Sequence, residues 1–250
     1  MKKIPLLDLV VATGLEEGRA RALIMAGRVR INAQVETRVN RPVQPDVTLD
    51  IDDEKKLPSR AGEKLRGALE LFKISVKDRV CIDLGAAHGG FSTVLLAGGA
   101  RRVYAVDVAY GLLDYHLRNE PRVVVLERRN ARYISGEWFE VDDLKSPEGF
   151  FVVCDLSFIS LKTILNSLQS LAAEMPGPLE GIFLIKPQFE ASHLTEGGVI
   201  RDEKIRATIL DEVLRYADNL GYSTIEVAPA VISGMAGNVE YTAHLVYESD

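Results

Sequence analysis

The sequence feature that most constrains the fold of this chain is a loop of small residues between two apolar segments. Residues 80–82, Val-Cys-Ile, lead into Asp83, and the loop at 85–90 follows. The next segment, residues 91–97, has the composition of a helix. A strand, a small-residue loop and a helix in this order form the cofactor-binding end of an open α/β sheet. We therefore expect a ligand site where the first strand ends.

The glycines of this loop bear on which ligand it binds. Gly85, Gly89 and Gly90 lack the Cβ that would collide with a ligand pressed against the backbone. Their pattern, Asp-x-Gly-x-x-x-Gly-Gly, differs from the dinucleotide form Gly-x-Gly-x-x-Gly, and no Lys-Ser/Thr follows as in a P-loop. S-adenosylmethionine (SAM) fits better, because it has no phosphates. A glycine-rich turn that binds nothing is the alternative.

The overall composition limits the chain to a few classes of protein. With 250 residues, 47% hydrophobic and 26% charged, it suits a soluble protein with one large domain, or a small domain plus a medium one. No apolar run approaches the roughly 18 residues of a membrane helix, and the N-terminus lacks signal-peptide features. Cys81 and Cys154 lie in apolar, strand-like runs, which favours reduced thiols over a disulfide. We expect a cytoplasmic protein without membrane contact, and without a metal because zinc-ligand spacing is absent.

The charge is unevenly distributed along the chain. Residues 1–50 carry eight Lys and Arg against six Asp and Glu, a balance of +2, so the remainder carries −8 within the total of −6. The negative total argues against nonspecific binding of nucleic acid. A slightly basic head on an acidic body is, however, compatible with an RNA-binding module joined to an enzyme.

The N-terminal segment, residues 1–51, predicts a small α+β domain. An apolar patch at 6–11 and a helical segment at 17–25 precede strand-like stretches at 29–32, 34–37 and 47–51. In the helical segment we expect Arg19 and Arg21 to be exposed, while Ala22, Leu23 and Ile24 face inward.

Residues 22–33, Ala-Leu-Ile-Met-Ala-Gly-Arg-Val-Arg-Ile-Asn-Ala, resemble the S-four RNA-binding domain of ribosomal proteins and pseudouridine synthases. The resemblance implies RNA binding by this domain, and its candidate contacts are Arg19, Arg21, Arg28 and Arg30. A solvated helix face that carries these arginines is the alternative. Residues 52–58 are charged and end in Pro58, which is the composition of a linker.

The remaining residues, 59–250, predict alternating helices and strands. Helices are expected at 61–72, 91–97, 161–173 and 204–220, and strands at 80–82, 102–107, 123–126, 150–154, 181–185, 223–228 and 242–247. The second strand ends in Asp107, about 20 residues after the loop, where a carboxylate binds the ribose hydroxyls of a nucleoside. Asn130 and Ala131 follow the third strand, at the level expected for an adenine ring.

Four ionisable residues lie next to the ends of elements that converge on one edge of such a sheet. They are Lys64, Asp155, Lys186 and Glu240. Burying an ammonium is costly unless it is paired, and an alternating Lys–Asp–Lys–Glu cluster supplies the pairs. Such a cluster also leaves one lysine able to lose its proton. A salt-bridge network without a chemical role is the alternative.

Five ordered motifs resemble the TlyA/hemolysin A family. They are Ser-Arg-Ala-Gly-Glu-Lys-Leu (59–65), Asp-Leu-Gly-Ala-Ala-His-Gly-Gly-Phe (83–91), Cys-Asp-Leu-Ser-Phe-Ile-Ser-Leu (154–161), Leu-Ile-Lys-Pro-Gln-Phe-Glu (184–190) and Gly-Asn-Val-Glu-Tyr (237–241). That family joins an S-four domain to an FtsJ-type ribose 2'-O-methyltransferase domain. The resemblance implies an α/β, class I SAM-dependent methyltransferase fold for residues 59–250, Rossmann-like with a mostly parallel seven-stranded sheet.

The resemblance also implies roles for individual residues. Lys64, Asp155, Lys186 and Glu240 stand at the family's catalytic tetrad. The implied cofactor contacts are Asp83, Gly85, Ala87, His88, Gly89, Gly90, Asp107, Asn130, Ala131 and Asp155. Phe158, Ser233 and Asn238 stand on its substrate side. Ala87-His88 replaces a small polar pair of the family, so His88 either crowds the methionine end of the cofactor or points outward.

The function that the resemblance implies is methyl transfer from SAM to a ribose 2'-hydroxyl of ribosomal RNA. Lys186 would deprotonate or orient the hydroxyl, with Asp155 and Glu240 setting its charge and Lys64 positioning the hydroxyl. Phe158 is a candidate stacking surface for the target nucleotide, and ribosomal RNA or a ribosomal subunit is the partner. The alternatives are a non-catalytic RNA- or ribosome-binding protein with a degenerate SAM pocket, and a membrane-lytic protein, although a strongly basic amphipathic helix is lacking.

Overall fold

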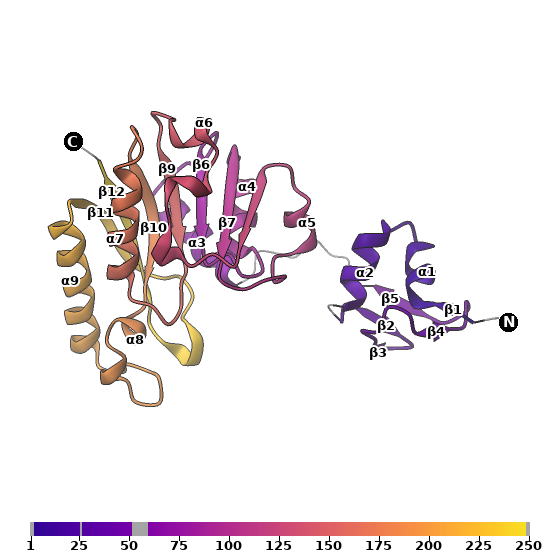
Figure 1. The fold of residues 1–250 in the computed structure, drawn as a ribbon. Helices are drawn as coiled ribbons and strands as arrows, with labels where there is room; N and C mark the ends of the chain where they lie inside the picture. The colour runs from indigo at the N-terminus through magenta and orange to yellow at the C-terminus, as the bar shows by residue number, and fades with distance from the viewer. Residues whose placement is uncertain (1–2, 26, 52–59, 249–250) are drawn as a thin grey trace. The chain divides into compact units, whose positions relative to one another are not determined.

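The computed structural model describes residues 3–25, 27–51 and 60–248. The chain divides into two compact units, Met1–Leu57 and Pro58–Asp250. The linker expected at 52–58 lies outside the described residues. Figure 1 shows the helices and strands of both units.

The first unit packs two helices on short strands. Its elements are β1 (Ile4–Pro5), α1 (Leu6–Val11), α2 (Glu17–Met25), β2 (Val29–Ile31), β3 (Gln34–Val35), β4 (Pro42–Val43) and β5 (Leu49–Ile51). The strands form a three-stranded antiparallel sheet, β3-β2-β5, and a separate antiparallel pair, β1-β4. The core comprises apolar side chains of both helices with Val29, Ile31 and Val43. The α+β composition is as expected, whereas the β1-β4 pair was not predicted.

One expectation for α2 is wrong. Arg19 is only 6% exposed, and the apolar residues that α2 buries with it are Ala20, Leu23 and Ile24. Positions 19, 20, 23 and 24 share one helical face, because residues three and four apart lie above one another. Arg21 is exposed as predicted and pairs with Glu17 one turn earlier, at 3.2 Å.

The second unit contains a seven-stranded sheet in the order β11-β12-β10-β9-β6-β7-β8. Its strands are β6 (Val80–Leu84), β7 (Arg102–Asp107), β8 (Val123–Glu127), β9 (Phe150–Cys154), β10 (Leu179–Ile185), β11 (Tyr222–Pro229) and β12 (Tyr241–Tyr247). All pairings from β8 to β10 are parallel, and β12 is antiparallel to both β10 and β11. The prediction of a mostly parallel seven-stranded sheet is therefore confirmed.

Helices cover both faces of this sheet (Figure 1). They are α3 (Arg60–Leu71), α4 (Gly90–Ala97), α5 (Tyr115–Arg118), α6 (Val141–Leu144), α7 (Leu161–Ala172), α8 (Pro187–Glu190) and α9 (Glu203–Asn219), with 3-10 turns at Ala131–Tyr133, Gly136–Trp138, Ser192–Leu194 and Met235–Gly237. Alternate residues of β6 enter two cores: Ile82 belongs to the one that includes side chains of α7 and α9, and Cys81 to the one that includes side chains of α3 and α4. Strands buried on both faces read as continuous apolar runs, which explains Phe150–Cys154.

The strand order reverses beside β6. This strand pairs with β7 on one side and with β9 on the other. The connections that leave β6 and β9 therefore diverge and open a crevice at the carboxyl edge, where open α/β sheets bind ligands. In the described part of the chain, no helix is long and apolar enough to cross a membrane.

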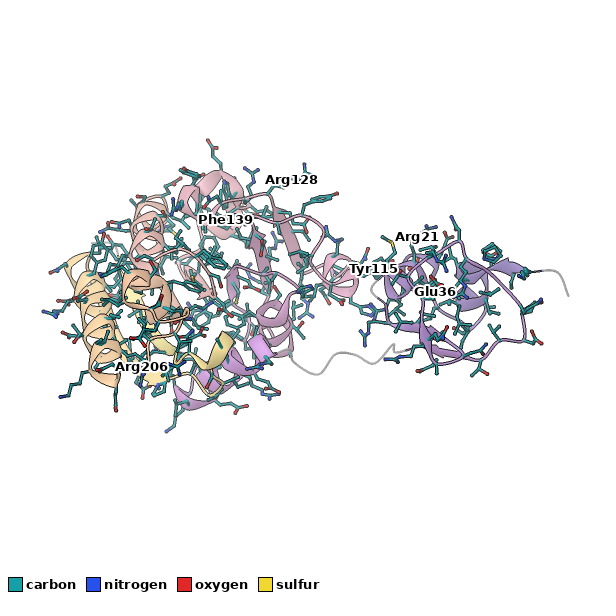
Figure 2. All side chains as sticks on the ribbon, turned by 90° about the horizontal axis from the view of Figure 1, so that it is seen from below. Arg21, Glu36, Tyr115, Arg128, Phe139 and Arg206 are labelled. Carbon is teal, nitrogen blue, oxygen red and sulfur yellow. The ribbon has the colours of Figure 1, made fainter. Side chains whose placement is uncertain are left out.

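Glu36 holds the turn after β3 in the first unit (Figure 2). Its carboxylate is 5% exposed and accepts hydrogen bonds from the backbone N–H of Thr37 and Arg38 and from the guanidinium groups of Arg38 and Arg41. The hydrogen bonds from Arg38 hold the pKa of Glu36 well below its ordinary value. A lowered carboxyl pKa stabilises the fold above the unfolded-state pKa of about 4, and this stabilisation is lost as the pH falls towards the lowered value.

We predict that Glu36→Gln loosens the first unit at neutral pH, because the neutral amide cannot hold both guanidinium groups. Hydrogen exchange followed by mass spectrometry should show faster exchange in peptides from 27–51 and unchanged exchange in peptides from 60–248. Glu17→Gln, at an exposed position of the same unit, is the matched control. Equal protection in Glu36→Gln and the native protein would contradict the role of this carboxylate.

Candidate active site

The loop between β6 and α4 turns on two glycines with left-handed backbone. Gly85 has φ 91° and Gly89 has φ 88°, which favour glycine. A Cβ on Gly85 would lie 2.9 Å from the carbonyl oxygen of Asp155, and one on Gly89 would lie 1.9 Å from Leu117. At these two positions the absence of a Cβ lets the loop pack against Asp155 and Leu117. The protein's own packing therefore requires these glycines, in addition to the predicted approach of a ligand.

Asp83, in β6, is hydrogen-bonded to Ser92 in α4, the helix that follows the loop. It is fully buried, and its Oδ2 accepts hydrogen bonds from the N–H of Ser92 at 2.9 Å and from its hydroxyl at 2.7 Å. Its Oδ1 is buried and has no hydrogen-bond partner among the described residues. Burial, aided by the charges of Asp155 and Asp107, raises the pKa of the Asp83 carboxyl to about 7. The carboxyl therefore changes its charge near neutral pH.

One end of the crevice is built by the ends of β7 and β8. Asp107 accepts hydrogen bonds from the N–H of Ala87 and of Ala109, both at 2.8 Å. Asn130 accepts one from the N–H of Arg132, and Ala131 is buried. Asp107, Asn130 and Ala131 line one cavity of about 210 Å³ together with Gly85 and Ser157.

A second cavity, of about 490 Å³, lies on the other side of Gly85 and Ser157, which line both. All four tetrad residues line it, as do Ala87, His88 and Gly90. Ala87 and His88 are exposed. His88 thus faces solvent at the cavity wall, and its imidazole does not fill the loop.

Lys64 and Glu240 form one ion pair of the tetrad. The Nζ of Lys64, on α3, lies 2.6 Å from Oε2 of Glu240, which precedes β12. The other oxygen, Oε1, accepts a hydrogen bond from the side-chain amide of Gln188 at 3.0 Å. Because both oxygens of Glu240 are engaged, its orientation is fixed and Lys64 is held towards the cavity.

Lys186 and Asp155 form the second ion pair. Lys186 follows β10 and its Nζ lies 2.7 Å from Oδ1 of Asp155, which follows β9. The same Nζ donates to the hydroxyl of Ser157 at 3.2 Å. The two lysines are 8% and 7% exposed, and each has a carboxylate partner, as the cost of burying an ammonium requires. The structure thus brings the four predicted residues into one cavity.

The residues predicted on the substrate side are dispersed. Phe158 is 89% exposed and lines the smaller cavity, and its ring contacts that of Phe189 at a tilt of 46°, with centroids 5.0 Å apart. The carbonyl oxygen of Ser233 accepts a hydrogen bond from Arg60 at 3.3 Å. Asn238 is buried and does not line the cavity, because its amide donates to Gly198 at 3.0 Å and its Oδ1 accepts from Ile200 at 3.4 Å. The side chain of Asn238 thus holds the loop that contains Gly198 and Ile200.

The arginines predicted to bind RNA belong to the first unit and differ in exposure. Arg19 is buried, as described above, and Arg28 is half-buried. Arg30 is half-buried and lies 3.1 Å from Asp50. Arg21 and Arg30 therefore each have a carboxylate partner that a phosphate would have to replace.

Several residues of the cavity escaped the sequence analysis as individual sites. Those nearest the tetrad in the sequence include Gln188, Ser157 and Phe189. Each lies within three residues of a tetrad member, in the motifs 154–161 and 184–190. Proximity to Asp155 and Lys186 was the available signal, but which neighbour turns inward depends on the backbone after each strand.

The fold and the crevice define the class of the second unit: a class I SAM-dependent methyltransferase fold, with the last strand antiparallel between β10 and β11. The model of FtsJ-like methyltransferases matches residues 57–247, and the chain belongs to this family.

Similar proteins are known along nearly the whole chain. The 16S/23S rRNA (cytidine-2'-O)-methyltransferase TlyA of Mycobacterium tuberculosis is 41% identical over 96% of this chain and 89% of its own. Hemolysin A of Brachyspira hyodysenteriae is 37% identical over 96% and 98%. A solved structure from Streptococcus thermophilus that carries the hemolysin name superposes with a TM-score of 0.71, at 34% identity over 100% and 90%.

The chemistry of the crevice fits SAM. The carboxylates of Asp107 and Asp155 line the crevice, and SAM carries a sulfonium and an ammonium group without any phosphate. The cavities of about 210 and 490 Å³ adjoin at Gly85 and Ser157, which suits an elongated ligand. The smaller cavity, with Asp107 and Asn130, would hold the nucleoside and the larger one the methionine end.

We predict that SAM affinity rises with pH up to about 7 and then levels off. A cation near Asp83 favours its charged form, so binding below the raised pKa of about 7 must release a proton. The linkage amounts to roughly tenfold in affinity for each pH unit below that value. Calorimetry between pH 5.5 and 8.5, in buffers of different ionisation enthalpy, measures both the affinity and the proton.

Asp83→Asn should remove this pH dependence, because the amide does not titrate. Asp218→Asn, at an exposed position on α9, should retain it. A native protein whose SAM affinity is flat from pH 5.5 to 8.5 would show that Asp83 does not respond to the cofactor.

Proposed function

We propose that this protein transfers a methyl group from SAM to the 2'-hydroxyl of a ribose in ribosomal RNA. The observation that carries the proposal is the meeting of two buried lysine–carboxylate pairs in one cavity next to the glycine loop. The similarity to a protein named as a cytidine-2'-O-methyltransferase of ribosomal RNA supports the substrate class.

The residues of the cavity account for the proton that the reaction releases. A 2'-hydroxyl is a poor nucleophile at neutral pH until a base accepts its proton. We assign Lys186, held by Asp155 and Ser157, to deprotonate or orient the hydroxyl. Lys64, fixed by Glu240, positions the ribose oxygen. Bound SAM supplies the electrophilic methyl group.

The cofactor contacts follow from the crevice. We assign the nucleoside to Asp107, Asn130 and Ala131, and the methionine end to Asp83 and the loop that contains Gly85, Ala87, His88, Gly89 and Gly90. Asp155 belongs to both parts of the site, because it borders the loop at Gly85 and pairs with Lys186. Alignment of the hydroxyl with the methyl group supplies much of the rate enhancement in such a site.

The target nucleotide has to leave its stack to reach this cavity. Enzymes that modify buried nucleotides act on single-stranded RNA or turn the nucleotide out of the helix. Phe158 projects an exposed ring near the second ion pair, because that ring contacts Phe189, three residues after Lys186. We assign this ring to the base of the target nucleotide.

The first unit is the part of the chain proposed to hold the RNA. We interpret residues 1–51 as an S-four RNA-binding domain and 59–250 as the methyltransferase domain. Arg21 and Arg30 are its accessible candidates, since each makes only an ion pair at the surface, and such pairs contribute little to stability. A phosphate can therefore replace Glu17 or Asp50 at small cost.

We predict that Lys186→Ala lowers kcat for methyl transfer by about 100- to 10,000-fold, the usual contribution of a general base. Purified ribosomal subunits and labelled SAM provide the assay, and mapping of ribose methylation identifies the product. Lys204→Ala, at an exposed position on α9, is the control. Full activity of Lys186→Ala would refute its role, and absence of any ribose methylation by the native protein would refute the proposed function.

We also predict that Arg21→Ala and Arg30→Ala weaken binding to ribosomal subunits without changing SAM affinity. Each lost phosphate contact should make the slope of log affinity against log salt less negative by about 0.7 to 0.9. Arg215→Ala is a matched control, because Arg215 also forms an exposed pair one helical turn from its partner. An unchanged slope of log affinity against log salt in both Arg21→Ala and Arg30→Ala would contradict RNA binding by the first unit.

A further inference from the structure

A series of side-chain contacts joins the segment after β9 to the segment after β10. The contacts are Lys186 with Asp155 at 2.7 Å, Lys186 with Ser157 at 3.2 Å, Phe189 with Phe158 at 5.0 Å between centroids, Glu190 with Ser160 at 2.5 Å and Glu190 with Leu161 at 2.7 Å. They follow the same order along both segments. The first contacts belong to the tetrad, whereas those of Glu190 have no part in the chemistry described so far.

The last contacts of this series are those of Glu190 with the start of α7. One carboxylate oxygen accepts the hydroxyl of Ser160, and the other accepts the backbone N–H of Leu161. Ser160 itself caps α7 by accepting from the N–H of Lys162 at 3.2 Å. A carboxylate at the N-terminus of a helix satisfies donors that have no partner within the helix and interacts favourably with the helix dipole. Glu190 is therefore a strong point of attachment for the loop.

Phe158 lies in the loop between these attachments. Its φ of 64° is a left-handed conformation that aromatic residues rarely adopt, and its ring is 89% exposed. Such a conformation persists only where the surroundings fix it. Lys186 holds Ser157 on one side of Phe158, and Glu190 holds Ser160 on the other. The ring is thus displayed to solvent from a loop that is fixed at both ends.

We propose that Glu190 is a positioning residue for methyl transfer. Its hydrogen bonds to Ser160 and Leu161, called here the Glu190 bridge, fix the loop that presents Phe158 beside Lys186. The inference rests on the proposed function, in which the target base stacks on Phe158 while Lys186 accepts the proton. The bridge sets the distance between the stacked base and the reacting hydroxyl, although Glu190 touches neither.

The test compares Glu190→Ala, Glu190→Gln and Ser160→Ala in the full chain. Glu190→Ala removes both hydrogen bonds and should lower kcat with ribosomal subunits at least tenfold, while KM for SAM stays within twofold. Glu190→Gln can still accept one of the two hydrogen bonds and should recover part of the loss. Should Glu190→Ala fail to fold, Ser160→Ala tests the proposal in its place. This variant removes only one of the two hydrogen bonds and should lower kcat by a smaller factor. Glu212→Ala, at an exposed position on α9, is the control.

A fluorescent reporter tests the bridge without any activity. The chain has one tryptophan, Trp138, so Phe158→Trp in a Trp138→Phe background places the single indole on the loop. Removal of the bridge should lower the anisotropy of this indole, and Glu212→Ala should not. An unchanged kcat in folded Glu190→Ala, or an unchanged anisotropy, would overturn the proposal. If the native protein methylates no RNA, the proposed function fails, and the anisotropy alone still decides whether the bridge fixes the loop.

Discussion

The burial of two ammonium groups at one edge of the sheet is the constraint on which the rest of the site depends. Each buried ion costs several kcal/mol unless a partner compensates it, so Lys64 and Lys186 require the carboxylates that lie 2.6 and 2.7 Å away. Lys64 and Glu240 are 176 positions apart in the sequence, and their pair forms only after α3 and the segment before β12 have come together. The two ion pairs therefore depend on complete folding of the second unit, since removal of one partner leaves the other buried and unpaired.

Carboxylates and lysines lie together in the crevice. The charges of Asp107 and Asp155 help to raise the pKa of the buried Asp83, and the larger cavity pairs its two lysines with Asp155 and Glu240. The carboxylates near the glycine loop suit a cationic cofactor, and the paired lysines suit a hydroxyl that must lose a proton. Asp155 lies where the two meet, because its carbonyl oxygen borders Gly85 and its carboxylate pairs with Lys186. A substitution at Asp155 therefore disturbs both halves of the site, whereas Asp83 and Glu240 each act on one.

The sequence predicts the sheet and the tetrad but not the contacts between loops. The central strands of the second unit are recognisable because burial on both faces leaves them almost wholly apolar, as in Phe150–Cys154, and Asp155 and Lys186 follow directly on such strands. Arg19 was misplaced because its charge suggested exposure, while the packing of Ala20, Leu23 and Ile24 turns position 19 inward as well. Asn238 was placed on the substrate side by the motif around it, and only the fold shows that its amide binds the loop at Gly198 and Ile200. Contacts of this kind depend on loop paths that periodicity does not encode.

The pairing of the segments after β9 and β10 offers a physical reason why the chemistry and the display of the target base are linked. In-line transfer requires the hydroxyl and the methyl group within a fraction of an ångström of their reacting positions. The backbone of Phe158 is strained by about 1–3 kcal/mol, so a loop free to relax would withdraw its ring. The segment of five residues that begins with Lys186 carries the amine, the ring that contacts Phe158 and the carboxylate of Glu190. Because one short segment holds all three, a displacement of α8 as a unit would move the ring contact and the amine together and preserve the distance between them.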